Sequence, residues 1–448
     1  MKEVIERDPE KDVRKETIMS LAKIQTAVNQ CDRCGSCLTV CPLYRLTQRE
    51  TAAARGKLAT VRALIEGGLT ADAKIARAFE FCLLCKACTE ICPSKIQTDA
   101  AMIEARQYTA ETLGRRAKQR LIAGFMGSNA LIKLAAGTLK LSRKTGLSGL
   151  LRGVVPLEHT KKHYQEMLTG PAALPSVIPT TRSEMPKPKP KTSQPQRPES
   201  ELPEPKMYHP DTPYMGMTPH ARIAYFQGCA MKLFFPEASH ATVNVLRKTA
   251  EVVVPESVCC GMPHLAHGMA DQAKALAKKN IEAFTEADWI ITDCASCGSS
   301  LKEYGQRLAA EPLWAERAQM FSQKVMGLSE YLYKIGYQPN YDASLKVTYH
   351  DPCHLVRGQG IKKQPRELLQ RAGAYVEMPQ ADTCCGGAGT FYLDFPETAQ
   401  QVLKEKVYNI ESTHAEVVVT ECPSCLMQLA KGEQQSGRFK VMHISQVL

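Results

Sequence analysis

The chain has 448 residues, of which 44% are hydrophobic and 23% are charged, as in an ordinary folded globular protein. Its formal net charge is +11, and it contains 18 cysteines, far more than an ordinary cytosolic chain of this length. No segment offers the roughly 18 consecutive apolar residues of a membrane-spanning helix, and the N-terminus carries no apolar signal stretch. We therefore expect two to three domains in a cytoplasmic protein whose thiols stay reduced.

Residues 1–165 are predicted to form a helical domain. Apolar residues recur at helical spacing over 52–66 and 73–81, and Gly67 and Gly68 end the first of these segments. Toward the end of this domain, residues 114–163 contain eleven Lys and Arg but only one acid, Glu158. This basic, partly amphipathic stretch would lie on an anionic membrane, cover the preceding helices, dock a partner protein or remain a solvated face. It lacks interleaved aromatic residues, so nucleic-acid binding is not expected.

Two copies of the pattern Cys-x2-Cys-x2-Cys-x3-Cys-Pro occur in this helical domain, the first beginning at Cys31 and the second at Cys82. This is the spacing of two-cluster ferredoxins, in which the fourth cysteine of each run binds the other cluster. Structural zinc is the alternative, but zinc sites use paired ligands and do not need such runs. Because forty residues separate the two runs, we expect an all-α ferredoxin-like module. The two predicted [4Fe–4S] ligand sets are Cys31, Cys34, Cys37 and Cys92, and Cys82, Cys85, Cys88 and Cys41.

Residues 166–221 are predicted to be a linker. Thirteen prolines fall between 171 and 219, with Lys-Pro-Lys-Pro-Lys at 187–191, and such a stretch forms an extended spacer rather than helix or sheet. From residue 222 onward, short β-branched or apolar runs alternate with helical segments such as 271–284, which predicts a parallel α/β sheet. The candidate strands are 223–226, 252–254, 289–292, 345–349, 374–377 and 417–420.

The remaining ten cysteines form two sets with the same order: one cysteine, then Cys-Cys-Gly, then Cys-x2-Cys. We therefore interpret 222–340 and 341–448 as two copies of one cysteine-rich unit, named repeat 1 and repeat 2. In both, most cysteines follow the C-terminal ends of candidate strands, the edge where parallel α/β sheets bind ligands. The two sets are Cys229, Cys259, Cys260, Cys294 and Cys297 in repeat 1, and Cys353, Cys384, Cys385, Cys422 and Cys425 in repeat 2.

These sets resemble the cysteine-rich domain of the heterodisulfide reductase family. The full order of motifs is similar to the iron–sulfur subunits of glycolate oxidase and of D-lactate dehydrogenases, to a related component of anaerobic glycerol-3-phosphate dehydrogenase, and to fused heterodisulfide reductase subunits. The segments beginning Cys297-Gly-Ser-Ser-Leu-Lys-Glu-Tyr and Cys384-Cys-Gly-Gly-Ala-Gly-Thr-Phe are most similar to the glycolate and lactate branch. The resemblance covers residues 31–100 and 222–448.

The resemblance implies cofactors beyond the two ferredoxin-type cubanes. In the heterodisulfide reductase branch a complete set of five cysteines holds a non-cubane [4Fe–4S] cluster, so one or two further clusters are expected here. The chain departs from the glycolate oxidase pattern, in which the first set tends to be incomplete. Two alternatives therefore stay open: an ordinary cubane with one spare thiol, or a set kept only for structure.

The resemblance also implies a function. The chain would pass electrons from a separate FAD-containing 2-hydroxyacid dehydrogenase, with glycolate or D-lactate as substrate, to a quinone or another membrane carrier at the inner face of the cytoplasmic membrane. No Gly-x-Gly-x-x-Gly follows a strand, so we expect no flavin or nicotinamide within this chain. The rival function is an enzyme that reduces a heterodisulfide at a repeat cluster. Four histidines near the cysteines would tune potential or move protons, or more simply satisfy backbone groups: His264, His267, His350 and His354.

Overall fold

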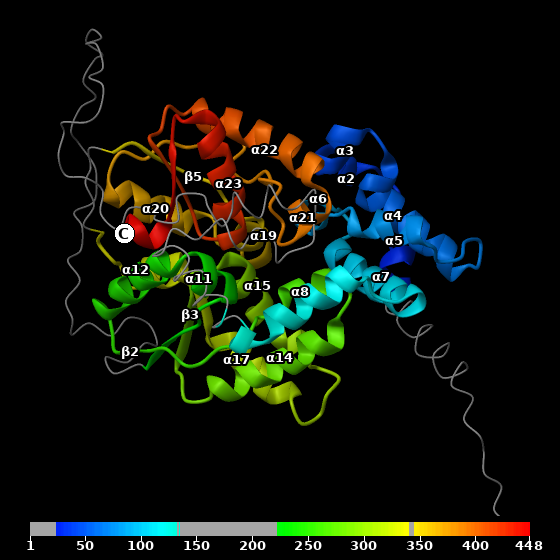
Figure 1. Ribbon diagram of the computed structural model, residues 1–448, viewed down its shortest axis with the longest axis horizontal. Coiled ribbons are helices and arrows are strands. Elements are labelled where there is room, and N and C mark those ends of the chain that lie inside the picture. Colours follow the sequence, from blue (N-terminus) through cyan, green and yellow to red (C-terminus); the bar gives the residue numbers. More distant parts are fainter. Residues whose placement is uncertain (1–23, 132–133, 135–221, 340–344) are drawn as a thin grey trace, which may run out of the picture.

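The computed structural model describes residues 24–131, 134, 222–339 and 345–448 (Figure 1). The described part of the first domain is helical, as predicted. The proline-rich linker and most of the basic stretch lie outside the described residues. The elements of this domain are α2 (Ser36–Val40), α3 (Pro42–Thr47), η1 (Glu50–Ala52), α4 (Ala54–Ile65), α5 (Ala73–Glu80), α6 (Ala87–Ile91), α7 (Thr98–Leu113) and α8 (Ala117–Gly127).

The predicted helix over 52–66 begins two residues late, because Ala53 has extended backbone angles that separate η1 from α4. Gly56 permits this close turn, since a Cβ there would lie 2.3 Å from the carbonyl oxygen of Glu50. The helix predicted over 73–81 is α5. It begins after Asp72, whose carboxylate accepts a hydrogen bond from the backbone N–H of Ile75 at 2.7 Å and so caps the helix.

Repeat 1 is built on a parallel four-stranded sheet in the order β2-β1-β3-β4. Its strands are β1 (Ile223–Tyr225), β2 (Val252–Val253), β3 (Trp289–Thr292) and β4 (Val325–Gly327). Helices connect the strands, as right-handed parallel crossovers require. They are α11 (Cys229–Phe234), α12 (Pro236–Arg247), α13 (Met262–Ala266), α14 (Ala270–Ala283), α15 (Ala295–Lys302), α16 (Tyr304–Arg307), α17 (Ala315–Lys324) and α18 (Leu328–Lys334).

Repeat 2 is built on a parallel three-stranded sheet in the order β5-β6-β7. Its strands are β5 (Val347–Tyr349), β6 (Val417–Thr420) and β7 (Lys440–His443). The helices are α19 (Cys353–Gln359), α20 (Lys363–Ala372), α21 (Phe391–Asp394), α22 (Pro396–Glu411) and α23 (Pro423–Ser436), followed by η3 (Ile444–Gln446). Two parallel sheets with the same order of cysteine motifs confirm the predicted duplication of an α/β unit.

The strand predictions hold except for one wrong strand and two missed strands. The prediction of a strand over 374–377 was wrong, because that segment makes only a single bridge, from Tyr375 to Val347. The strands β4 and β7 were missed. Each is a short run after a helix, and three of the four residues of β7 and all of β4 are buried, so neither shows the alternation that marks a strand.

One apolar core runs through both repeats. It contains Tyr225 and Ile291 of the first sheet together with Tyr349 and Val418 of the second. The helical module lies at one end of this α/β body, where α7 contacts α13, α6 contacts α19 and α3 contacts α22 (Figure 1). Within the described ranges, no helix combines the length and apolarity needed to cross a membrane.

Candidate metal centres

The two ferredoxin-type loops share one unusual backbone shape. In each, the residues immediately before and after the second cysteine are left-handed, with positive φ: Arg33 and Gly35 around Cys34, and Leu84 and Lys86 around Cys85. A left-handed non-glycine residue costs about 1 kcal/mol, so such strain is retained where the surrounding structure requires that shape. The loops therefore have a fixed curvature, and the three thiols of each run are neighbours.

Cys41 lies with the thiols of the second run. Burial, followed by the neighbouring thiols of Cys82 and Cys41, raises the pKa of Cys88 to about 12. Cys37 lies near Cys31 and Cys34, and its pKa is raised, first by burial. Cys92 packs on an apolar cluster that Cys31 and Cys82 both border as well. Cys34 is the exposed thiol among the 18.

The five thiols of each repeat form a chain of neighbours, and the order of contact is the same in both. In repeat 1, Cys229 neighbours Cys259, Cys259 neighbours Cys260, Cys260 neighbours Cys297 and Cys297 neighbours Cys294. Repeat 2 has the equivalent links: Cys353 to Cys384, Cys384 to Cys385, Cys385 to Cys425 and Cys425 to Cys422. Eight of these ten cysteines are buried. Neighbouring thiols hold the pKa values of Cys260 in repeat 1, and of Cys385 and Cys422 in repeat 2, well below the usual range.

The backbone conformation after the paired cysteines requires the glycine of each Cys-Cys-Gly motif. Gly261 and Gly386 have φ values of 89° and 88°, in the left-handed region that glycine adopts without strain. A Cβ on Gly261 would lie 3.1 Å from the Cβ of Ala273, and one on Gly386 would lie 2.7 Å from the carbonyl oxygen of Ala399. The backbone must therefore turn sharply against a helix directly after the paired cysteines.

A buried carboxylate precedes the Cys-x2-Cys motif of each repeat. Asp293 accepts hydrogen bonds from the hydroxyls of Tyr225 at 2.6 Å and Thr242 at 2.8 Å. Glu421 accepts one from the hydroxyl of Tyr349 at 3.1 Å. Burial raises the pKa of Asp293 and raises that of Glu421 to about 7. The two tyrosine–carboxylate pairs fix the ends of the strands that carry the thiols.

The second ferredoxin-type loop, the thiols of repeat 2 and the thiols of repeat 1 adjoin one another. Burial and the neighbouring thiol of Cys353 raise the pKa of Cys85 well above its usual value, which places the second ferredoxin-type loop against repeat 2. On the other side, the thiol of Cys422 neighbours that of Cys294 in repeat 1. Ser296 reinforces this junction, since its Oγ lies 3.4 Å from the Cys422 sulfur. Repeat 2 therefore lies between the ferredoxin-type module and repeat 1.

Three of the four histidines named from the sequence bind groups on neighbouring segments. The Nε2 of His264 donates to the carbonyl of Ala123 at 3.1 Å, and the Nε2 of His354 donates to that of Leu84 at 3.2 Å. The Nε2 of His267 lies 2.9 Å from the hydroxyl of Thr390. These contacts agree with the simpler of the two interpretations, in which such histidines satisfy loops.

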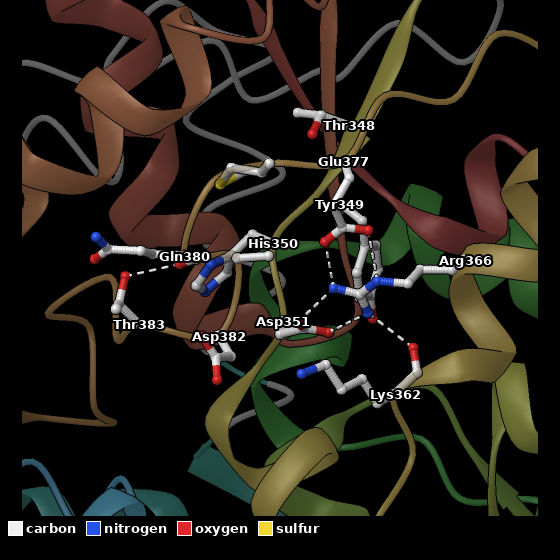
Figure 2. A network of polar contacts seen from close by, with 12 residues as sticks. Thr348, Tyr349, His350, Asp351, Lys362, Arg366, Glu377, Gln380, Asp382 and Thr383 are labelled. Atoms are coloured by element: carbon white, nitrogen blue, oxygen red, sulfur yellow. Dashed lines mark hydrogen bonds and ion pairs between the residues drawn. The ribbon is translucent and has the colours of Figure 1, made fainter. Parts of the chain in front are cut away.

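His350 is different. It is fully buried, and neither ring nitrogen has a hydrogen-bond partner among the described residues. One of its nitrogens and the sulfurs of Cys385 and Cys425 all lie within 4.8 Å of one another. Burial lowers its pKa to about 3, so the ring is neutral. Figure 2 shows it beside the Asp351–Arg366 ion pair. An unpartnered imidazole facing two thiols fits a metal group in this space.

The sequence analysis missed two buried lysines beside the thiols, Lys57 and Lys406, which are 2% and 1% exposed. Lys57 donates to the carbonyls of Thr51 and Ala78, near Cys41 and Cys82. Burial lowers its pKa to about 8. Lys406 lies between Leu403 and Ile410 on the apolar face of α22. A lysine at such a position in the sequence could have indicated that its side chain is buried.

The thiols therefore fit iron–sulfur clusters. Buried sulfurs in groups, strained loops of ferredoxin spacing and an unpartnered imidazole are all accounted for by bound metal groups. Such a cluster, when bound, takes up and releases one electron at a time at a potential set by its surroundings. The chain's own contribution is to hold the thiols at fixed positions, exclude water from most of them and place charged groups nearby.

Comparisons with known proteins agree with this geometry. Residues 27–96 match the model of a 4Fe-4S dicluster domain, and residues 223–302 and 347–430 match that of a cysteine-rich domain. The chain is 32% identical over 438 residues to the "Probable glycolate oxidase iron-sulfur subunit" of Bacillus subtilis, an alignment that covers 93% of this chain and 92% of that protein.

Two further relatives match about half of the chain. "Lactate utilization protein A" of Halalkalibacterium halodurans is 34% identical over 234 residues, which cover 51% of this chain and 96% of that protein. One of the subunits of the "Fumarate reductase (CoM/CoB)" of Methanothermobacter marburgensis is 35% identical over 241 residues. That match covers 52% of this chain and 47% of the methanogen protein.

Proposed function

Because the chain belongs to the family of glycolate oxidase iron–sulfur subunits, we propose that it is the electron-carrying partner of a flavin-dependent 2-hydroxyacid dehydrogenase. The complex of the two would oxidise glycolate or D-lactate at the flavin of a separate subunit. The electrons would then pass through this chain to a quinone or another membrane carrier. A flavin reduced by two electrons needs one-electron acceptors, which thiolate-bound clusters provide.

The proposal assigns four clusters. Two are ferredoxin-type cubanes, one held by Cys31, Cys34, Cys37 and Cys92 and the other by Cys82, Cys85, Cys88 and Cys41. Each repeat would hold one further [4Fe–4S] cluster, of non-cubane type, on its five cysteines. Support for two repeat clusters comes from the identical order of thiol contacts in the two sets.

The observation that carries the proposal is the unbroken adjacency of the thiol groups. Cys85 neighbours Cys353, and Cys422 neighbours Cys294, so the second ferredoxin-type site, repeat 2 and repeat 1 follow one another without a gap. Electron tunnelling slows steeply with distance, so adjacent cofactors buried in one body favour transfer along the series. Exposed Cys34 belongs to the remaining cluster, which would be the surface contact for one external redox partner.

Anaerobic purification with native partners tests this function. A flavoprotein should co-purify, and adding glycolate or D-lactate should reduce the clusters of this chain within the complex. The EPR signals of the reduced clusters report the transfer. A complex that oxidises the hydroxyacid while these clusters stay oxidised would contradict the proposal.

The junction between the repeats supports a second candidate, heterodisulfide reduction. Both cysteine sets are complete, and their inner thiols meet at Cys294 and Cys422, so two clusters would flank one small space. Disulfide cleavage needs two electrons, which two adjacent clusters would supply. Reduction of a heterodisulfide to two thiols by the isolated loaded chain, with a chemical reductant as the electron donor and no flavoprotein present, would favour this candidate over the first.

Membrane association through residues 114–163 forms a separate part of the proposal. Within the described portion, α8 exposes Leu121 at 74%, and Leu134 beyond it is 65% exposed. Several basic residues share this segment, including Arg116 and Arg120. Exposed leucines among cations are typical of a segment that lies on an anionic bilayer. Co-sedimentation with vesicles containing anionic lipid should occur at low salt and disappear with purely zwitterionic lipid. Equal binding to both would contradict the electrostatic component.

A further inference from the structure

The two repeats share their order of strands, turns and thiols, so differences between them can be assigned to single positions. Phe226 and His350 are equivalent. Each follows the tyrosine that ends its first strand, and the N–H of each donates to the next strand, to Ile291 at 2.8 Å and to Val419 at 2.9 Å. The carbonyl of each accepts from a threonine hydroxyl of that strand, Thr292 at 3.2 Å and Thr420 at 3.1 Å.

Ala277 and Lys406 are also equivalent. Gly261 faces Ala273 of α14, and Gly386 faces Val402 of α22, with distances from the ideal glycine Cβ to the side-chain Cβ of 3.1 and 3.2 Å. One helical turn further along each helix stand Ala277 and Lys406, both buried. Repeat 1 therefore has a phenyl ring and a methyl group where repeat 2 has an imidazole and an ammonium group.

The ammonium group of Lys406 is held close to the repeat 2 thiols. Its Nζ donates to the carbonyls of Gln380 at 2.7 Å and Ala381 at 3.2 Å, in the loop that leads into Cys384 and Cys385. The same carbonyl of Ala381 accepts the N–H of Asp351, two residues before Cys353. Lys406 thus joins the two segments that carry three of the five thiols. Its hydrogen-bond partners within the described residues are carbonyls and the sulfur of Met378, with no carboxylate among them.

The other cations near the repeat 2 thiols are each paired with two carboxylates; Asp351 among these is buried, whereas Glu377, Glu90 and Asp382 are 53%, 59% and 37% exposed, so water screens their charges. Figure 2 shows Arg366 bonded to both carboxylate oxygens of Asp351, at 2.9 and 2.7 Å, and to Glu377. Arg357 pairs with Glu90 and Asp382. Lys406 has no ion-pair partner among the described residues. Burial lowers the pKa of its ammonium group, whereas the neighbouring thiols of Cys385, Cys353 and Cys384 favour the charged form.

The charges around repeat 1 do not offset this difference. Near its thiols, Arg307 pairs with Glu303. The carboxylates of Asp293 and Glu421 stand at equivalent places in the two repeats, so they do not distinguish them. Directly beside the thiols, the difference between the repeats is therefore one buried lysine and one buried imidazole, both on the side of repeat 2.

We propose that repeat 2 holds the higher-potential cluster of the two repeats, and that His350 and Lys406 are the residues that raise its potential. This inference rests on the proposed function in one respect, that each repeat binds a cluster. Reduction adds a negative charge, which a buried cation stabilises strongly because the surrounding dielectric is low. The ring nitrogen of His350 that lies within 4.8 Å of the sulfurs of Cys385 and Cys425 would act in the same direction as a donor, since hydrogen bonds to cluster sulfurs raise the potential.

The position of repeat 2 in the series gives this difference in potential a functional consequence. An electron that arrives from Cys85 reaches repeat 2 first, and it would remain there in preference to moving on to repeat 1. Repeat 1 would then be reduced only when repeat 2 is already occupied. The middle of the series would act as an electron store that lets two electrons accumulate side by side.

Potentiometric EPR titration of the full chain, anaerobically loaded and reduced with dithionite through mediators, tests the proposal. Chain labelled with ¹⁵N-histidine identifies the repeat 2 signal, because the His350 nitrogen should couple to that cluster and His350→Phe should abolish the coupling. Of the two repeat signals, the nitrogen-coupled one should be reduced first. In Lys406→Gln, which keeps a hydrogen-bond donor but loses the charge, the ratio of reduced to oxidised repeat 2 cluster at fixed ambient potential should fall at least tenfold, about 59 mV for one electron.

Matched variants separate charge from folding. Lys406→Arg should restore the native midpoint. Lys57→Gln should move a ferredoxin-type signal instead, and Lys346→Gln, whose Nζ binds the carbonyl of Thr413 at the opposite end of β5, should move none. Iron content and thermal unfolding of each variant show whether it is folded and loaded.

Three outcomes would overturn the inference: an unchanged midpoint in fully loaded Lys406→Gln, a nitrogen-coupled signal reduced after the other repeat signal, or iron sufficient for only one repeat cluster. None of these depends on a hydroxyacid or a flavoprotein. Failure of the proposed electron-transfer function would appear separately, as clusters of normal potential that the partner does not reduce.

Discussion

The two cysteine-rich repeats have the same backbone arrangement around their thiols but different buried side chains beside them. The turn after the paired cysteines, the tyrosine–carboxylate pair and the order of thiol contacts are common to both. The buried residues beside the thiols differ. They are Phe226 and Ala277 in repeat 1, and His350 and Lys406 in repeat 2. On the proposed assignment, the shared backbone geometry would bind a cluster in each repeat, whereas the few buried side chains that differ would set its potential.

The largest loss of stability is expected from replacing the glycine that follows the paired cysteines in each repeat. Gly386→Ala should lower stability by about 3 kcal/mol, because it combines left-handed strain with a clash against the backbone of Ala399. Gly261→Ala should cost less, about 2 kcal/mol, since the nearest atom is a side-chain methyl at 3.1 Å. Urea unfolding of the anaerobic protein, with iron counted in each variant, measures both.

Gly437→Ala is the control for this pair. Its φ is 65°, but a Cβ there meets no atom within 4 Å, so only the left-handed cost of about 1 kcal/mol remains. If all three variants lost the same stability, the close contact after the paired cysteines would not be what requires glycine.

A smaller loss of stability is expected when the tyrosines that bond to the buried carboxylates are replaced. Tyr225→Phe removes a hydrogen bond of 2.6 Å to buried Asp293, and Tyr349→Phe removes one of 3.1 Å to buried Glu421. Leaving a buried carboxylate short of a donor costs about 1–3 kcal/mol, and the loss should be larger for Tyr225→Phe because its bond is shorter. Unfolding midpoints of the two variants test the order, and the reverse order would show that the pairs are not equivalent.

Docking of the helical module should depend modestly on Lys86. Its Nζ pairs with Asp99 at 2.7 Å within the module and with Glu303 of repeat 1 at 3.1 Å. Lys86→Gln should cost about 1 kcal/mol, and the loss should shrink at high salt. A loss that does not change with salt would assign the effect to the strained loop instead of the ion pairs.

The smallest effect belongs to the surface contact between α3 and α22. Arg45 and Glu405 pair at 3.3 Å with side chains 37% and 43% exposed. Arg45→Ala should change stability by no more than about 0.5 kcal/mol, measured by the same urea titration. A loss above about 1 kcal/mol would mean that this edge of the module is more tightly coupled to repeat 2 than its exposure suggests.

Much of the fold followed from the sequence because the signals were local. The helical module, the parallel sheets and the duplication rest on periodicity and on cysteine spacing, which nearby residues determine. The strands β4 and β7 were missed because a buried run of three or four residues has no period.

The relations between segments distant in sequence were not predictable. Nothing local indicates that Cys85 meets Cys353, or that Cys422 meets Cys294 across the repeats. The two buried lysines were likewise overlooked, because a lysine on a helix is usually exposed and only the packing of α4 and α22 buries it.

The most direct test of the account is the iron and acid-labile sulfide content of the anaerobically purified full chain, compared with that of Cys385→Ser. The account predicts four iron and four sulfide at each of four sites, with the substitution removing one site's complement and leaving the ferredoxin-type EPR signals in place. A folded native chain with no iron, or with iron only in the ferredoxin-type module, would contradict it.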